Sequence, residues 1–117
     1  MKFIKSLGVL LIITLYSITL HAGEYQRQDV TIVRLHPIAD NRPAAPAYQN
    51  ITRVYLTHGA WGNSTCRQDA ADLLKTDTHL LSLLITGWTT NKKINIVVDD
   101  ALRLGDSVCQ ITALYLE

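Results

Sequence analysis

The sequence has few of the residues that build metal or cofactor sites. It contains only two cysteines, four histidines and one methionine among 117 residues. His36, His58 and His79 lie about 20 residues apart, whereas zinc ligands usually come in pairs about two to five residues apart. We therefore expect no metal site and no cofactor.

Catalytic patterns are also missing from the sequence. The G-x-S-x-G turn that carries a nucleophilic serine is absent, and no two carboxylates stand out as a pair for glycoside cleavage. Asp99, Asp100 and Asp106 occur close together in the stretch DDALRLGD, but their spacing does not fit a calcium-binding loop. This stretch is better explained as a solvated turn, and we expect a protein that is not an enzyme.

Charge of one sign does not dominate the chain. Eleven lysines and arginines face 10 acidic residues, which gives a net charge of +1. After residue 22 the longest basic run is Lys92-Lys93. Binding to nucleic acid or to an anionic membrane surface relies on clustered basic residues. We therefore expect no nucleic-acid partner.

The N-terminus has the three parts of a secretory signal peptide. Lys2 and Lys5 form a positive head, residues 7–20 (LGVLLIITLYSITL) are almost wholly apolar, and Ala22 is a small residue at the expected cut. The match is imperfect because Leu20 is large for its place before the cut. As a helix, the apolar run would span roughly 20 Å, short of the ~30 Å hydrocarbon core, so an uncleaved membrane anchor is the weaker alternative.

The sequence thus predicts a signal peptide over residues 1–22 and a single domain over residues 23–117. We expect a secreted or periplasmic protein that meets the membrane only through this transient segment. Without Lys2 and Lys5, 9 basic residues face 10 acidic ones, and the net charge becomes −1. A domain of about 95 residues buries only about 60–70% of its chain surface, so its stability should be small.

The only two cysteines, Cys66 and Cys109, become informative in an exported chain of this size. An even number of cysteines in an oxidising compartment favours a disulfide. In the chain-entropy model, closing the loop from residue 66 to residue 109 contributes on the order of 4 kcal/mol. Two buried free thiols are the alternative.

The first half of the mature chain is typical of β-strands. Residues 24–36 are rich in β-branched side chains that alternate with polar ones, up to His36-Pro37. All three prolines lie in residues 37–50, which indicates a loop. Residues 51–58 alternate again, with Val54 and Leu56 on one side, so we expect two antiparallel strands.

A helix follows this strand pair after an ambiguous stretch. Residues 67–75 fit either a short helix or an irregular connection. Asp77 or Thr78 can then cap a helix, Gly87 would let it pack close to a sheet, and Asn91 can end it in a left-handed conformation. The apolar side chains at helical spacing are Leu80, Leu81, Leu84, Ile85 and Trp88.

The chain closes with two further strands. Residues 94–98 form an apolar run that Asp99-Asp100 is expected to end, and residues 109–116 make the last strand. The order is therefore two strands, a short piece, a helix and two strands. This α+β, mostly β order predicts a small twisted antiparallel sheet or barrel with one packed helix.

A candidate recognition loop follows the second predicted strand. Its residues of interest are His58, Trp61 and Asn63. Binding residues often gather on loops held by a rigid scaffold. Trp61 lies between glycines, where it could be exposed and stack on a sugar or a protein partner, or instead fill the lid of the core. Trp88 lies on the apolar face of the helix, which favours core packing.

Four segments of the chain resemble a known group of proteins. They are WGNSTC, THLLSLLITGW, KKINIVVDD and SVCQITALYL. Together they resemble small secreted OB-fold-like bacterial proteins, a group that includes the B subunits of subtilase-type AB5 toxins. The resemblance implies an OB-like five-stranded barrel crossed by a helix and, in the toxin subunits, a homopentamer that binds cell-surface glycans.

These observations lead to two functional hypotheses. The first is a secreted, non-catalytic binding module, in the form of a homo-oligomer if it follows the toxin subunits, that recognises a glycan or a protein. The alternative is a periplasmic interaction or inhibitor protein that docks on another protein. An exposed aromatic residue in a loop and a subunit interface would favour the first hypothesis.

Overall fold

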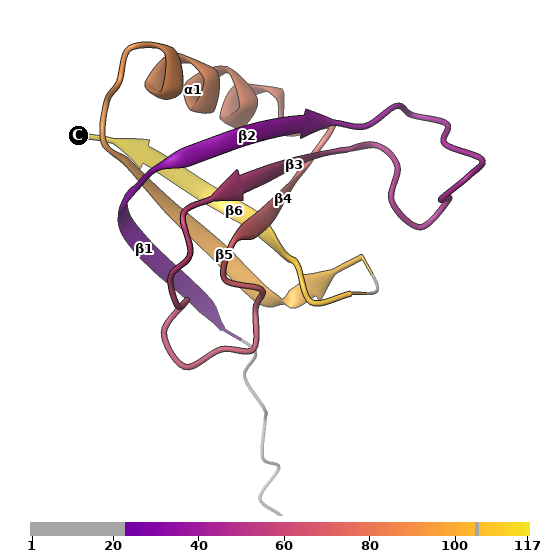
Figure 1. Ribbon diagram of the computed structural model, residues 1–117, viewed down its shortest axis with the longest axis horizontal. Coiled ribbons are helices and arrows are strands. Elements are labelled where there is room, and N and C mark those ends of the chain that lie inside the picture. Colours follow the sequence, from indigo (N-terminus) through magenta and orange to yellow (C-terminus); the bar gives the residue numbers. More distant parts are fainter. Residues whose placement is uncertain (1–22, 105) are drawn as a thin grey trace, which may run out of the picture.

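The structure, a computed structural model, describes residues 23–104 and 106–117, so the predicted signal peptide lies outside it. This part of the chain is mostly β, with one helix packed on a curved sheet (Figure 1). No helix within it is long and apolar enough to cross a membrane. The elements are β1 (Glu24–Val30), β2 (Ile32–Pro37), β3 (Ile51–Leu56), β4 (Ala70–Leu74), α1 (Thr78–Thr89), β5 (Ile94–Arg103) and β6 (Cys109–Leu116).

The six strands form one mixed sheet in the order β1-β5-β6-β4-β3-β2. Its two edge strands, β1 and β2, are separated in sequence by Thr31 alone, so the sheet curls back on itself without closing (Figure 1). The predicted wholly antiparallel sheet is wrong at one place, because β4 and β6 run parallel, with Asp72 opposite Gln110. This pairing arises because α1 carries the chain from β4 to β5, and the β5–β6 hairpin then brings the chain back beside β4.

Three predicted boundaries differ from the structure. The strand expected over residues 24–36 is interrupted at Thr31, shortly after Asp29, whose φ of 55° and local register shift turn the chain. The ambiguous segment 67–75 contains strand β4. Asp99 does not end β5, because it continues the ladder opposite Glu24 on one side and Gln110 on the other.

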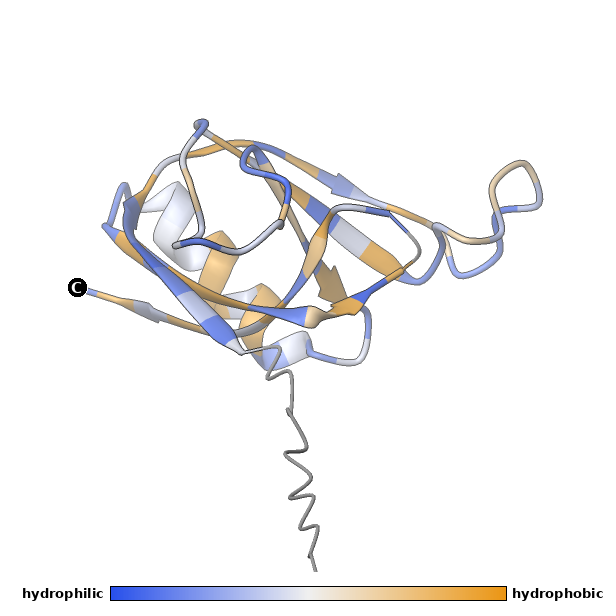
Figure 2. Cartoon of the chain, turned by 90° about the horizontal axis from the view of Figure 1, so that it is seen from below, coloured by the Kyte–Doolittle hydropathy of each residue, from blue (hydrophilic) through white to orange (hydrophobic). Residues whose placement is uncertain are grey.

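The core lies between the concave face of the sheet and α1. Alternation along β3 buries Val54 and Leu56, as predicted, and leaves Arg53 and Tyr55 on the outer face. Figure 2 shows hydrophobic residues along the strands and on the helix. Among the described residues, the aliphatic side chains with no exposed area are Val54, Ala71, Leu84, Ile96, Val98 and Ile111.

Helix α1 packs against β5 and β6 through Leu84 and Gly87, which are both buried. A Cβ atom on Gly87 would lie 2.6 Å from Leu116 Cδ2 and 3.0 Å from Ile94 Cδ1. The predicted close approach at Gly87 is therefore confirmed. The side chain of Asp77 makes no capping hydrogen bond, contrary to the prediction for this position.

The C-terminal end of α1 follows the sequence prediction at Asn91 but not at Trp88. Asn91 has a φ of 59°, and the amides of Asn91 and Lys92 donate to the carbonyls of Trp88 and Gly87. This is a Schellman ending. Trp88 is 41% exposed instead of buried, because the stripe through Leu84 and Gly87 faces the sheet and the next residue is rotated by about 100°.

The close packing at Gly87 makes a first testable prediction. We expect Gly87→Val to lower the free energy of unfolding by about 1–3 kcal/mol, because the added atoms must displace Leu116 and Ile94. Urea unfolding followed by far-UV circular dichroism measures this change. The matched control is Gly23→Ala, whose new Cβ meets no atom within 4 Å. Equal midpoints for Gly87→Val and the unsubstituted protein would contradict the packing described.

Candidate functional site

The predicted disulfide between Cys66 and Cys109 is present, with a Cα–Cα distance of 5.5 Å. It joins the loop that follows β3, residues 57–69, to the start of β6. Two hydrogen bonds reinforce this link. The Arg67 amide donates to the Ser107 carbonyl at 2.7 Å, and Arg103 Nη2 donates to Thr65 Oγ1 at 2.7 Å. Loop 57–69 is therefore held firmly against the segment between β5 and β6.

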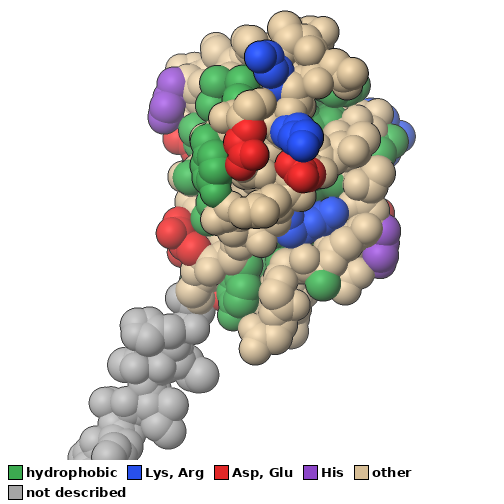
Figure 3. Space-filling model, turned by 90° about the vertical axis from the view of Figure 1, so that its left-hand side faces the viewer, with side chains coloured by type: hydrophobic (Ala, Val, Ile, Leu, Met, Phe, Trp, Pro, Cys, Tyr) green, Lys and Arg blue, Asp and Glu red, His purple; other side chains and the backbone are tan. Residues whose placement is uncertain are grey.

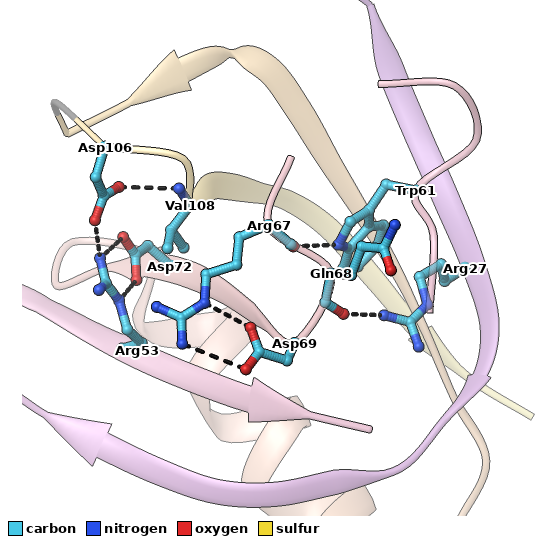
Figure 4. Close-up of polar contacts among 9 residues, drawn as sticks. All are labelled: Arg27, Arg53, Trp61, Arg67, Gln68, Asp69, Asp72, Asp106 and Val108. Atoms are coloured by element: carbon cyan, nitrogen blue, oxygen red, sulfur yellow. Dashed lines mark hydrogen bonds and ion pairs between the residues drawn. The ribbon is translucent and has the colours of Figure 1, made fainter. Parts of the chain in front are cut away.

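Trp61 closes one end of the core. It is 1% exposed, and its Nε1 donates to the Arg67 carbonyl at 3.0 Å. The Arg27 guanidinium lies 5.0 Å from the ring centroid and donates to the Gln68 carbonyl at 2.9 Å (Figure 4). It also donates to the Thr57 carbonyl at 2.9 Å. Burial lowers the pKa of Arg27. The sequence left two alternatives for Trp61, an exposed stacking surface or a lid that fills the core. The structure shows the lid.

The other two residues of the candidate recognition loop lie on its outer side. His58 and Asn63 are exposed, while Trp61 between them points inward. Gly62 adopts a φ of 57° and lies against the ring of Tyr25, so the loop is packed on β1 as well as tied by the disulfide. Recognition by His58 and Asn63 stays a prediction, without the stacking surface that Trp61 would have supplied.

A buried ion pair lies on the outer face of the sheet, where β3 and β4 are neighbours. Arg53 Nε and Nη2 donate to the two carboxylate oxygens of Asp72 at 2.7 and 2.8 Å, and Nη2 also reaches Asp106 at 3.2 Å (Figure 4). Hydrogen bonding to Asp72 raises the pKa of Arg53. Burial raises the pKa of Asp72, which is 2% exposed, although Arg53 opposes that shift.

Asp106 connects this ion pair to the turn that precedes β6. One of its carboxylate oxygens bonds Arg53 and the other accepts the Val108 amide at 2.9 Å. Asp99 and Asp100, which the sequence places in the same acidic stretch, belong instead to strand β5. Within residues 23–104 and 106–117, no group of three or more histidine, cysteine, aspartate or glutamate side chains could hold a metal ion.

A second arginine cluster surrounds Tyr55 on the same outer face. Arg34 on β2 lies opposite Tyr55 on β3, with its guanidinium carbon 4.1 Å from the ring centroid. Arg67 lies 5.8 Å from the same centroid and forms a two-point ion pair with Asp69, at 2.5 and 3.3 Å. Arg34 is exposed and, in the part of the chain that the structure describes, forms no ion pair.

A shallow hollow of about 380 Å³ lies beside Arg34 and Tyr55. Its further walls come from Val33, Leu56 and Asp69. Val33 is 59% exposed. An arginine that forms no ion pair with any described carboxylate thus borders an open, partly apolar depression. We call this area the Arg34 face.

The proline-containing loop 38–50 stands away from the sheet as an arm beside this region (Figure 1). Two internal turns order the arm, in which the amides of Ala45 and Tyr48 donate to the carbonyls of Arg42 and Ala45. At its base, Tyr48 lies with its ring centroid 5.5 Å from the Arg53 guanidinium. The arm therefore borders the outer face of β3.

The sequence alone could predict only part of the Arg34 face. Alternation along residues 51–58 places Arg53 and Tyr55 on one side, but it does not say which residue of another strand lies opposite each of them. Arg34 and Asp72 reach this surface through strand register, which depends on long-range pairing.

Comparison with known proteins does not place the chain in a family. No protein-family model, no curated protein and no solved structure matches it. The resemblance to AB5 toxin B subunits therefore gains no support from these comparisons.

Proposed function

We propose that this protein is an exported, non-catalytic binding module with an OB-like fold, which recognises a carboxylate-bearing glycan at the Arg34 face. The strand order supports the fold. If β1 and β2 count as one bent strand, five strands result, α1 connects the third to the fourth, and the third and fifth run parallel. An OB-fold is a partly open five-stranded barrel.

The position of the Arg34 face supports a binding role. OB-folds bind oligosaccharides and oligonucleotides on the face of their second and third strands, between two flanking loops. Under the same count, these strands are β3 and β4, and the flanking segments are the arm 38–50 and the turn before β6. The Arg34 face shares β3 with this surface and extends from it onto β2. The mature chain carries a net charge of −1, which favours an oligosaccharide over a nucleic acid.

The main observation behind the proposal is the position of the Arg34 guanidinium and its lack of a carboxylate partner among the described residues. The guanidinium is stacked on Tyr55 at 4.1 Å and exposed. Stacking fixes the plane of the guanidinium, and a planar guanidinium binds a carboxylate through two parallel hydrogen bonds. A sugar acid placed in the neighbouring hollow would supply that carboxylate and rest its ring on Val33.

Export and lack of catalysis rest on separate observations. The disulfide is typical of an oxidising compartment, in agreement with the signal peptide that the sequence predicts. On the outer face, Asp69, Asp72 and Asp106 are all held by arginines. A carboxylate engaged in this way is a poor general base, so binding explains the face better than acid–base chemistry.

Binding of a sialylated oligosaccharide and of its desialylated form tests the proposal by calorimetry. We expect the mature protein to prefer the sialylated form, and Arg34→Ala to weaken that binding at least about tenfold, because a hydrogen bond to a charged group contributes about 1.5–3 kcal/mol. Arg34→Lys should recover part of the affinity, since it keeps the charge but not the planar fork.

Lys93→Ala is the matched control for this experiment, because it removes one exposed positive charge away from the Arg34 face. It should bind like the unsubstituted protein. Equal affinity for both oligosaccharides, or full binding by Arg34→Ala, would refute the proposal.

Docking on another protein is the second candidate, and the ordered arm 38–50 favours it. Pro43 and Pro46 restrict the arm, and a preordered projecting loop loses little conformational entropy when it binds. A mature protein that ignores glycans but retains one specific partner through this arm would favour this function over the first.

A further inference from the structure

A second hollow, of about 210 Å³, lies where α1 ends against the junction of β1 and β2. It shares no residue with the Arg34 face. Its lining residues are Val30, Thr31, Ile32, Gly87, Trp88, Asn91, Lys92 and Ile94. Pockets for drug-sized ligands usually measure about 300–1,000 Å³, so this hollow suits one small ring.

Trp88 gives this hollow an aromatic wall. Its side chain is 41% exposed, whereas the neighbouring Gly87 is buried against the sheet. Gly87 lines the hollow with backbone atoms alone. An indole in this position offers apolar surface to a ligand while its edge stays hydrated.

Residues with polar side chains also line the hollow. The Schellman ending of α1 fixes the backbone of Asn91 and Lys92 beside Trp88, and Thr31 lies across from them at the β1–β2 junction. Among the described residues, the side chains of Thr31, Asn91 and Lys92 form no hydrogen bond or ion pair. They offer a hydroxyl, an amide and an ammonium group, which are available to a ligand.

Lys92 is the one charged residue that lines the hollow, and this side of the molecule carries charges of both signs. Figure 3 shows the side of the molecule at which α1 and β6 end. Positive and negative side chains stand there next to hydrophobic ones, and neither sign forms a continuous patch. A ligand suited to this place is small and neutral, with one apolar face and several hydroxyl groups.

We propose that the Trp88 hollow binds a single neutral pyranose ring. The ring stacks its C–H face on the indole of Trp88, and its hydroxyls exchange hydrogen bonds with Thr31, Asn91 and Lys92. This site is separate from the one proposed for a carboxylate-bearing sugar. Binding at the Trp88 hollow therefore does not depend on Arg34.

The test uses a panel of neutral methyl pyranosides and the two tryptophan side chains as reporters. In ¹H–¹⁵N spectra we expect the indole N–H of Trp88 to shift and saturate at millimolar sugar, which corresponds to about −4 kcal/mol, while that of the buried Trp61 stays in place. Sugar should also protect Trp88 from iodide quenching. Trp88→Ala should lose the binding measured by calorimetry, and Asn91→Ala should weaken it several-fold.

Ile85→Ala is the matched control, because Ile85 has the same 41% exposure on the same helix but does not line the hollow. It should bind sugar normally, as should Arg34→Ala, which separates this proposal from the proposed function. Absence of a saturable Trp88 shift with every sugar, or full binding by Trp88→Ala, would overturn the inference. Saturation by an apolar probe such as N-acetyl-leucine amide, with no response to sugars, would overturn it as well.

Discussion

Replacing Cys66 and Cys109 together by alanine lowers the free energy of unfolding by about 3–4 kcal/mol, the largest stability effect we expect from any pair of residues. The bridge links positions 43 residues apart, so its loss releases a long segment of the unfolded chain. It also frees loop 57–69, which carries the Trp61 lid. Urea unfolding of the chain over residues 23–117 measures the difference.

Two controls identify the cause of this loss. The unsubstituted protein in reducing agent should unfold at nearly the same urea concentration as the double variant, because both lack the bridge. Thr65→Ala, which removes only the hydrogen bond from Arg103, should cost about 1 kcal/mol or less. If the double variant keeps the original midpoint, the bridge does not stabilise the fold.

Asp72→Ala lowers the free energy of unfolding by about 3 kcal/mol, because it leaves the half-buried Arg53 with Asp106 as its only acidic neighbour among the described residues. The double variant Arg53→Leu/Asp72→Leu should lose less than Asp72→Ala, since it removes both buried charges. Asp106 loses Arg53 in this variant, but its carboxylate is 24% exposed and still accepts the Val108 amide. Thermal and urea unfolding of the two variants provide the comparison.

Asp69→Ala is the control for this second prediction. Its partner Arg67 and Asp69 itself are each 40% exposed, so breaking their pair should cost less than about 1 kcal/mol. An Asp72→Ala loss as small as that of Asp69→Ala would mean that Arg53 finds another partner or water when Asp72 is missing.

Local periodicity predicted most elements of this fold correctly. Residues 51–56 alternate between the core and the outer face as a half-buried strand should, and α1 begins at Thr78 as the leucine spacing indicates. The left-handed Asn91 and the close approach at Gly87 were also predictable, because each depends on one residue and its nearest neighbours. The disulfide followed from the count of cysteines.

The two tryptophans show where such reasoning fails. Trp88 belongs to an apolar stripe but lies beyond the edge of the contact between α1 and the sheet, and Trp61 lies in a polar loop but fills the end of the core. Both outcomes depend on how distant elements meet. The same holds for Arg34, which reaches Tyr55 only through the register of β2 with β3.

The place where the chain enters the sheet has a practical consequence for experiments on intact cells or surfaces. Gly23 is held by the Asp100 amide at one end of the sheet, whereas α1 covers the other end (Figure 1). A fusion partner or biotin tag attached ahead of Gly23 would therefore present the Trp88 hollow outward. Immobilisation of residues 23–117 through a tag placed there leaves the hollow open to ligand.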